Sequence, residues 1–292
     1  MLRHYRESSS SDRPKIESIV QNISASAGQP VPSVPYDTSG RSLFGRGYIV
    51  MQRIPGISLR DKLMADLAGT AEMVPKALGA TQARIHALDV GNLITALERS
   101  GTPARNYTPF RNLDGLTLLS DASGNPVITA LAMWLSNNRP ADPEKLFLCH
   151  GDFHSGNILV EDGRVTGVID WGNFAIGHAE YDVAVTRFIL SIGPIEDSPV
   201  PREQIDELIR QIVLGYNAAY AEIRTLDESL IDYYTALRMS HAMGKVLMGA
   251  DGANIPGMAH DGYIWGIPVI YNLMRRRLLE ITGIECGPLP TS

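Results

Sequence analysis

Apolar residues recur along the chain either at helical spacing or in short uninterrupted runs. Stretches with apolar residues three and four positions apart predict helices, and these cover residues 14–27, 56–69, 74–90, 126–138, 183–191, 203–223, 230–248 and 263–281. Short apolar runs predict strands over 1–5 and 48–51. Prolines and turn-forming residues are frequent over 91–124, so we expect an irregular connection there.

A β-hairpin is predicted over residues 158–169. An apolar run (Ile158 to Val160) and an alternating run (Val165 to Ile169) flank the sequence Glu-Asp-Gly-Arg. An Asp-Gly pair between two such runs is a strong short-range signal for a hairpin. This hairpin is the feature around which the candidate chemistry is arranged.

Three polar side chains stand at the ends of this hairpin. Asp152 and Asn157 precede its first strand, and Asp170 follows its second. Because a two-stranded ribbon brings its ends together, we expect these oxygens to converge. Carboxylate and amide oxygens suit a hard cation such as Mg²⁺, which takes its remaining ligands from water and phosphates. Ordinary turn chemistry explains Asp162 and Gly163, but it does not explain the polar residues at the hairpin ends.

The same segment matches a known catalytic loop. Residues 150–157, HGDFHSGN, have the spacing of the kinase loop, with Gly in place of the usual Arg. Asp170, in the sequence Ile-Asp-Trp, falls where kinases have their metal-binding DFG aspartate. The segment resembles the aminoglycoside phosphotransferase and choline kinase-like family, whose signatures are HGDxxxxN and IDW.

The resemblance implies a two-lobed, protein-kinase-like α+β fold. Residues 1–56 would form an incomplete small β lobe that ends at the hinge, and residues 57–292 a mainly helical lobe that binds the acceptor. It also implies an ATP- and Mg²⁺-dependent phosphotransferase, with GTP as an alternative donor, acting on a hydroxyl of a small molecule. Asp152 would be the catalytic base, and Asn157 and Asp170 would hold the metal.

The resemblance assigns further residues to the site. Arg3 would stand at the position of the phosphate-binding lysine, with Glu17 as its ion-pair partner. Backbone groups of Gln52 and Ile54 would meet the nucleotide base at the hinge.

Two more residues would support the site structurally. His150 belongs to the catalytic loop, and Asp182 would anchor the following helix and buttress that loop. His86 is expected to be a buried or hydrogen-bonding residue.

The chain departs from the family pattern at its beginning. The family has two strands and a phosphate-covering loop before the basic strand, whereas this sequence begins at that strand, which would leave it as an edge. Three interpretations stay open: a truncated product, a misassigned start, or a reduced lobe with weak or no activity. A non-catalytic, pseudokinase-like binding protein is therefore the rival hypothesis.

A metal-hydrolase interpretation of His150 and His154 is a further alternative. Residues four apart present two imidazoles to one metal only on a helix. Gly151 and Gly156 indicate a loop instead.

Composition narrows the class of partner. The net charge of −6 and the acidic isoelectric point argue against nucleic acid and anionic membranes as partners, and slightly favour a cationic substrate. No apolar run approaches the roughly 18 residues of a membrane span, and the N-terminal residues do not have the apolar core of a secretory signal. Two cysteines make no disulfide framework, so a cytoplasmic protein is expected. The sequence identifies neither the acceptor nor the oligomeric state.

Overall fold

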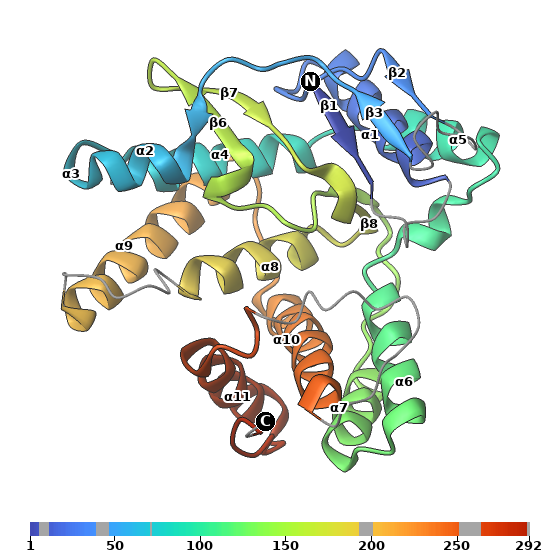
Figure 1. Cartoon of the computed structure of the whole chain (residues 1–292), viewed down its shortest axis with the longest axis vertical. Coiled ribbons are helices and arrows are strands. Elements are labelled where there is room, and N and C mark those ends of the chain that lie inside the picture. The colour runs from blue at the N-terminus through green and yellow to red at the C-terminus, as the bar shows by residue number, and fades with distance from the viewer. Residues whose placement is uncertain (6–11, 39–46, 71, 193–200, 251–263, 291–292) are drawn as a thin grey trace.

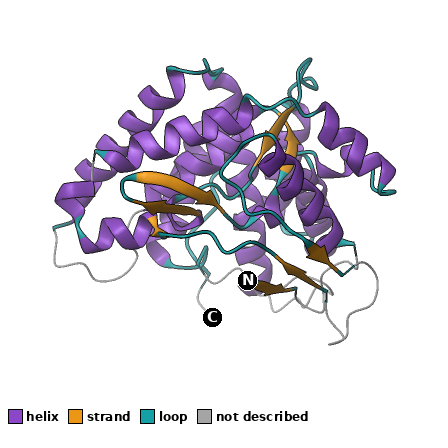
Figure 2. Ribbon diagram, turned by 90° about the horizontal axis from the view of Figure 1, so that it is seen from above, coloured by secondary structure: helices purple, strands orange, loops and turns teal. Residues whose placement is uncertain are grey.

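A computed structural model describes residues 1–5, 12–38, 47–70, 72–192, 201–250 and 264–290. Most of these residues lie in helices, and the strands are short and pair into small sheets (Figure 2). The strands β1 to β3 lie with α1 at one end of the molecule, and α6, α7, α10 and α11 lie at the other (Figure 1). The predicted division into residues 1–56 and 57–292 stays a prediction.

The N-terminal residues form a small antiparallel sheet with the order β1-β3-β2, built from β1 (Leu2–His4), β2 (Tyr36–Asp37) and β3 (Tyr48–Val50). Helix α1 (Arg13–Ser26) has Pro14 in its first turn, which suits the fixed φ of proline. It ends before Gly28, which has a φ of 80°. These features match the strands and the helix predicted for this part of the chain.

The predicted hairpin is present. Strand β6 (Ile158–Glu161) pairs antiparallel with β7 (Arg164–Val168), and β4 (Ile57–Ser58) adds a third strand beside β6. The turn residues Asp162 and Gly163 have φ of 49° and 75°. A two-residue hairpin turn with positive φ at both positions matches the twist of the strands, which is why an Asp-Gly pair suits it.

A second pair of strands closes the base of the candidate site. Strand β5 (Phe147–Cys149) precedes the HGD loop, β8 (Ala175–Gly177) follows the Asp170 segment, and the two pair antiparallel. The chain therefore leaves and returns at the same place, so both loops of the site are held at fixed positions.

The remaining helices are α2 (Leu59–Ala65), α3 (Leu67–Thr70), α4 (Met73–His86), α5 (Gly91–Arg99), α6 (Arg111–Ser123), α7 (Pro126–Asn137), α8 (Ala179–Ile192), α9 (Arg202–Ala221), α10 (Glu228–Ala250) and α11 (Pro268–Thr282). Short 3₁₀ turns lie at Ala104–Tyr107, Ser155–Asn157 and Trp171–Asn173. Helix α4 packs on α9, and α10 packs on α8 and α6. Within the described ranges, no helix combines the length and the apolar character needed to cross a membrane.

The prediction of an irregular connection over residues 91–124 is wrong, because α5 and α6 lie there. Leu93 and Leu97 bury one face of α5, and Leu116 is fully buried in α6. The turn-forming residues of this stretch lie at the ends of the helices: Gly124, with a φ of 61°, ends α6. They mark helix boundaries rather than a continuous loop.

Candidate active site

A buried carboxylate holds the start of the HGD loop. Asp182, in the first turn of α8, accepts the backbone N–H of His150 at 2.9 Å and that of Gly151 at 2.7 Å. Nε2 of His86 lies 3.0 Å from the same carboxylate, and Nδ1 of His86 lies 2.6 Å from the Tyr220 hydroxyl. Burial alone would raise the pKa of Asp182, but its contacts with His86 outweigh this and hold that pKa below its ordinary value.

Gly151 takes a conformation that other residues avoid. Its φ is 76°, and a Cβ at this position would lie 2.1 Å from the carbonyl oxygen of Asn173. The backbone of the HGD loop thus packs directly on the segment that follows Asp170. A side chain here would separate the two loops.

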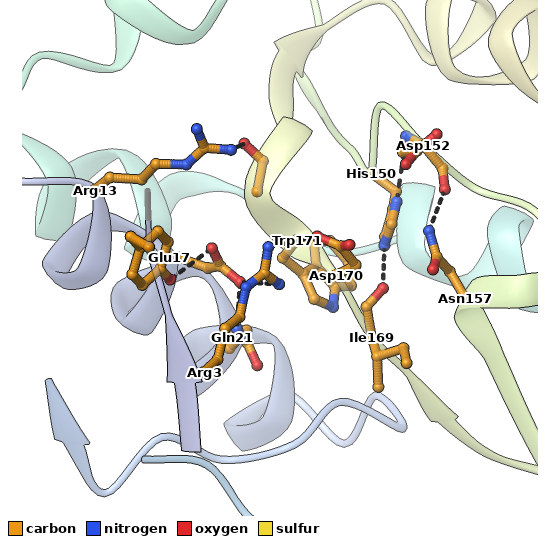
Figure 3. A network of polar contacts seen from close by, with 12 residues as sticks. Arg3, Arg13, Glu17, Gln21, His150, Asp152, Asn157, Ile169, Asp170 and Trp171 are labelled. Atoms are coloured by element: carbon orange, nitrogen blue, oxygen red, sulfur yellow. Dashed lines mark hydrogen bonds and ion pairs between the residues drawn. The ribbon is translucent and has the colours of Figure 1, made fainter. Parts of the chain in front are cut away.

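The imidazole of His150 links these same two loops. Its Nδ1 accepts the Asp152 N–H at 3.3 Å, so Nε2 carries the proton and donates to the Ile169 carbonyl at 2.9 Å. Figure 3 shows the ring between Asp152 and Ile169. His150 therefore connects the residue before Asp170 to the backbone of Asp152.

Asn157 lies at the start of β6 and is fixed from both sides. Its side-chain NH₂ group donates to the backbone carbonyl of Asp152 at 2.9 Å (Figure 3). The backbone carbonyl of Asn157 accepts the Ile169 N–H at 2.9 Å. The amide nitrogen is thus used within the loop. The side-chain oxygen is the atom that Asn157 can offer to a cation.

Asp170 is paired with Arg3. Oδ1 of Asp170 accepts from Nη2 of Arg3 at 2.7 Å, and Nη1 of Arg3 donates to Oε1 of Glu17 at 2.9 Å. The Tyr5 hydroxyl donates to the other oxygen of Glu17 at 2.7 Å. Figure 3 shows Arg3 between the two carboxylates. Asp170 has a φ of 65°, a left-handed conformation that is uncommon for a residue other than glycine.

Burial and Arg3 have opposing effects on the pKa of Asp170 and on that of Glu17. Burial would raise the pKa of Asp170, but the charge and hydrogen bond of Arg3 outweigh it and leave that pKa below its ordinary value. Burial raises the pKa of the more deeply buried Glu17 above its ordinary value, against the opposing effect of Arg3. The Arg3–Asp170 pair is therefore an ion pair at neutral pH.

Gln52 and Ile54, which are expected at the hinge, have contacts of their own. The backbone N–H of Gln52 donates to the Ser33 carbonyl at 2.8 Å. Ile54 lies against Gly167 of β7, since a Cβ on that glycine would come within 2.8 Å of its Cγ2. Their proposed contact with a nucleotide base stays a prediction.

A cleft of about 600 Å³ opens beside Asp152. Besides Asp152 and Glu17, its polar and charged walls include residues to which the sequence analysis gave no role in a phosphotransferase site, namely Arg13, Arg111, Asn112, His154, Arg238, His241 and Lys245. The spacing of Arg238, His241 and Lys245, which places them on one face of α10, was the available signal. That they face Asp152 depends on how α10 packs against α8, which the sequence pattern does not show.

The geometry bears on both metal hypotheses. Nδ1 of His154 accepts the Gly156 N–H at 3.0 Å, and His150 uses both its nitrogens within the protein. Among the described residues there is no group of three or more His, Cys, Asp or Glu that could hold a metal, so the metal-hydrolase alternative has no structural support. The oxygens of Asn157 and Asp170 instead fit a cation that takes most of its ligands from phosphates and water.

The short antiparallel sheets, the helical large region and the HGD loop beside the hairpin together define a kinase-like phosphotransferase fold. The family model described as "Phosphotransferase enzyme family" matches residues 1–226. The chain belongs to this family. The resemblance and the fold class expected from the sequence are therefore confirmed.

Solved structures show the same fold. A protein from Ralstonia eutropha assigned to the aminoglycoside phosphotransferases superposes with a TM-score of 0.66 and 19% identity, covering 97% of this chain and 85% of that one. A thermostable mutant of aminoglycoside phosphotransferase APH(4)-Ia superposes with a TM-score of 0.58 and 17% identity, covering 94% and 85%. That structure is a ternary complex with AMP-PNP and hygromycin B.

Curated relatives match only part of the chain. Acyl-CoA dehydrogenase family member 11 of Gallus gallus is 33% identical over 175 residues, which is 58% of this chain and 22% of that protein. Hygromycin-B 4-O-kinase of Escherichia coli is 28% identical over 173 residues, which is 55% of this chain and 48% of the kinase. The matched region thus spans about a fifth of the first relative and about half of the second.

Proposed function

We propose that the chain transfers the γ-phosphoryl group of ATP, or of GTP, to a hydroxyl group of a small molecule. The placement of Asp152 carries this proposal. Its carboxylate lies at the wall of a cleft, on a loop fixed by Asp182 and joined by His150 to the Asp170 segment. Phosphoryl transfer depends mostly on positioning and on charge stabilisation, and a rigid arrangement of this kind supplies both.

Asp152 would orient the acceptor hydroxyl and accept its proton. Nε2 of His154 lies 3.9 Å from Oδ1 of Asp152. Burial lowers the pKa of His154 below its ordinary value, so its imidazole is neutral at neutral pH. The carboxylate of Asp152 therefore has no charged imidazole paired with it, and its oxygens can accept the hydroxyl proton.

Asn157 and Asp170 would hold Mg²⁺ between them. When bound, Mg²⁺ neutralises charge on the nucleotide phosphates. Arg3 already occupies Oδ1 of Asp170, and Glu17 holds Arg3 in place. Arg3 would turn its guanidinium to the phosphates, which it can contact with two N–H groups at once. Backbone groups of Gln52 and Ile54 would meet the base.

The variant Asp152→Asn tests the base. We expect turnover to fall by about 10²- to 10⁴-fold, because a removed general base has effects of this size. The KM for the nucleotide should change by less than about threefold. The measurement is steady-state ADP release with the best acceptor available. Asp162→Asn is the matched control, since it makes the same chemical change in the hairpin turn, where Asn tolerates a positive φ. Near-normal turnover in Asp152→Asn would refute the assignment.

A non-catalytic nucleotide-binding protein is the second candidate. One observation favours it: the carboxylate expected to bind the metal is paired with an arginine. Such a protein would gain thermal stability when ATP is added but would release no ADP with any acceptor. The same assay, combined with a thermal-shift measurement, distinguishes the two functions.

A further inference from the structure

The cleft beside Asp152 has the opposite charge to the molecule as a whole. The chain carries a net charge of −6, yet four cationic side chains line the cleft, and these are Arg13, Arg111, Arg238 and Lys245. Two carboxylates face them, Asp152 and Glu17. Glu17 is already paired with Arg3, so among the described residues that line the cleft the three arginines outnumber the remaining carboxylate, that of Asp152.

Three of these cations are held in place without being neutralised. Arg13 donates to the Gly172 carbonyl at 3.3 Å, and Arg111 donates to the Asn173 and Phe174 carbonyls. The guanidinium of Arg238 lies 5.1 Å from the centre of the Trp265 ring. In the part of the chain that the structure describes, none of the three arginines has a carboxylate partner.

The pKa of His241 is lowered by burial and by these cations. Burial is the main cause that lowers its pKa to about 3, and the charges of Lys245, Arg238 and Arg111 lower it further. Its imidazole is therefore neutral at every physiological pH. Nδ1 of His241 is buried and has no hydrogen-bond partner among the described residues.

Three of the cations belong to helices that contribute no group to the proposed nucleotide site. Arg238 and Lys245 belong to α10, and Arg111 begins α6. The groups proposed for the nucleotide phosphates belong instead to β1 and to the two loops at the ends of the hairpin. Arg13, which contacts Gly172 next to the Asp170 segment, is positioned for phosphate. Arg111 and Arg238, which have no carboxylate partner among the described residues, are therefore the cations that we assign to the second substrate.

We propose that the acceptor is an anion: a hydroxylated small molecule whose carboxylate or phosphate group binds to Arg111 and Arg238 while its hydroxyl meets Asp152. This assignment rests on the proposed phosphotransferase function. Ile189, Ile192 and Trp265 also line the cleft, so a hydrocarbon portion between the anionic group and the hydroxyl would be accommodated. Aminoglycosides carry several ammonium groups, and this cleft would repel them. The slight preference for a cationic substrate expected from the overall charge is thus reversed at the site.

The first test is a panel of acceptors matched in shape and different in charge. The carboxylate arm contains 3-hydroxybutyrate and glycerate, and the phosphate arm contains glycerol 3-phosphate. Their neutral counterparts are 1,3-butanediol and glycerol, and choline and kanamycin are the cations. We expect one anionic arm to exceed its neutral counterpart at least about tenfold in kcat/KM, since tenfold corresponds to about 1.4 kcal/mol and one charge-assisted hydrogen bond supplies that much. The arm that responds identifies the anionic group.

The second test removes one cation. Arg238→Gln should lower kcat/KM for the anionic acceptor at least about tenfold while changing the KM for ATP by less than about twofold. It should leave kcat/KM for the neutral counterpart nearly unchanged. Arg276→Gln is the matched control, because it makes the same change on an exposed position of α11. Equal losses for anionic and neutral acceptors, or a preference for choline or kanamycin, would overturn the proposal.

Binding measurements distinguish the proposed anion site from the proposed phosphotransferase function. Calorimetry with 3-hydroxybutyrate and glycerol 3-phosphate, in the presence of a non-hydrolysable ATP analogue, needs no turnover. Binding that Arg238→Gln weakens, without ADP release, would refute the phosphotransferase and retain the anion site. Turnover of neutral or cationic acceptors without measurable anion binding would refute the anion site and retain the phosphotransferase.

Discussion

At the scale of single residues, Asp182 distributes one buried negative charge over three donors. Two are backbone N–H groups of the HGD loop, and the third is Nε2 of His86. Buried carboxylates are stable only when such donors compensate the lost hydration. The carboxylate of Asp182 therefore both holds the loop and contributes to the stability of the fold.

Asp182→Asn should lower the free energy of unfolding by about 3 kcal/mol, because an amide accepts these hydrogen bonds less strongly and brings a donor toward the loop N–H groups. Urea unfolding at pH 7 measures this. Asp114→Asn, in the exposed first turn of α6, is the matched control and should change stability by less than about 0.5 kcal/mol.

The effect of Asp182→Asn should depend on pH. The pKa of Asp182 is lowered in the folded protein, so its contribution is complete above the ordinary aspartate pKa, near 4, and is lost as the pH falls through the folded value. The difference between wild type and variant should therefore shrink below about pH 4. A difference that grew on acidification would contradict this account.

At the scale of elements, the hairpin and the HGD loop turn through glycines with nearly the same conformation but different surroundings. Gly151 and Gly163 have φ of 76° and 75°. No atom lies within 4 Å of a Cβ built on Gly163, whereas one on Gly151 would meet the Asn173 carbonyl. Substitutions at the two glycines therefore distinguish the cost of a left-handed backbone, which applies at both, from the cost of a steric contact, which applies only at Gly151.

Gly163→Ala should cost about 1 kcal/mol of stability, which is the strain of a left-handed alanine, and leave turnover within about twofold. Gly151→Ala should cost more and lower turnover at least about tenfold, because the loop carrying Asp152 must move away from Asn173. Thermal unfolding and ADP release measure the two effects. Similar behaviour of the two variants would show that the loop does not depend on this contact.

At the scale of the whole molecule, Arg3 joins three parts that are distant in sequence. It lies on β1, pairs with Glu17 of α1, and pairs with Asp170 at the end of the hairpin. Loss of Arg3 would leave two carboxylates without this cation, one of them buried. Without Arg3 both carboxylates ionise less readily, so the loss of stability on removing Arg3 should depend on pH.

Arg3→Met should destabilise the protein by about 2 kcal/mol at pH 8 and by less at pH 5. Burial raises the pKa of Glu17, and Arg3 opposes this, so the pKa of Glu17 should rise further without Arg3. The folded variant then binds a proton that the unfolded chain does not bind, and its free energy of unfolding falls as the pH rises. Asp170, whose lowered pKa depends on Arg3, acts in the same direction. Urea unfolding at both pH values measures the effect, with the exposed Arg53→Met as control. Equal destabilisation at pH 5 and pH 8 would show that Glu17 does not take part.

The sequence by itself determined the features that depend on neighbouring residues. The alternation around Asp162 and Gly163 predicted the hairpin, and apolar spacing predicted most of the helices. The HGDxxxxN and IDW segments indicated the family. Each of these signals depends on residues that lie close together in the sequence, within about one or two helical turns, so it can be detected without knowledge of the fold. The helices α5 and α6 were missed because their ends carry strong turn signals.

Only the tertiary structure decided which distant residues meet. His86 reaches Asp182 across 96 positions, and Arg3 reaches Asp170 across 167. The cations of α6 and α10 likewise face Asp152 only because α10 packs against α8 and α6. Such contacts depend on how helices and strands pack, and local spacing carries no information about that packing. For the same reason the charge of the acceptor site could not be inferred from the charge of the chain.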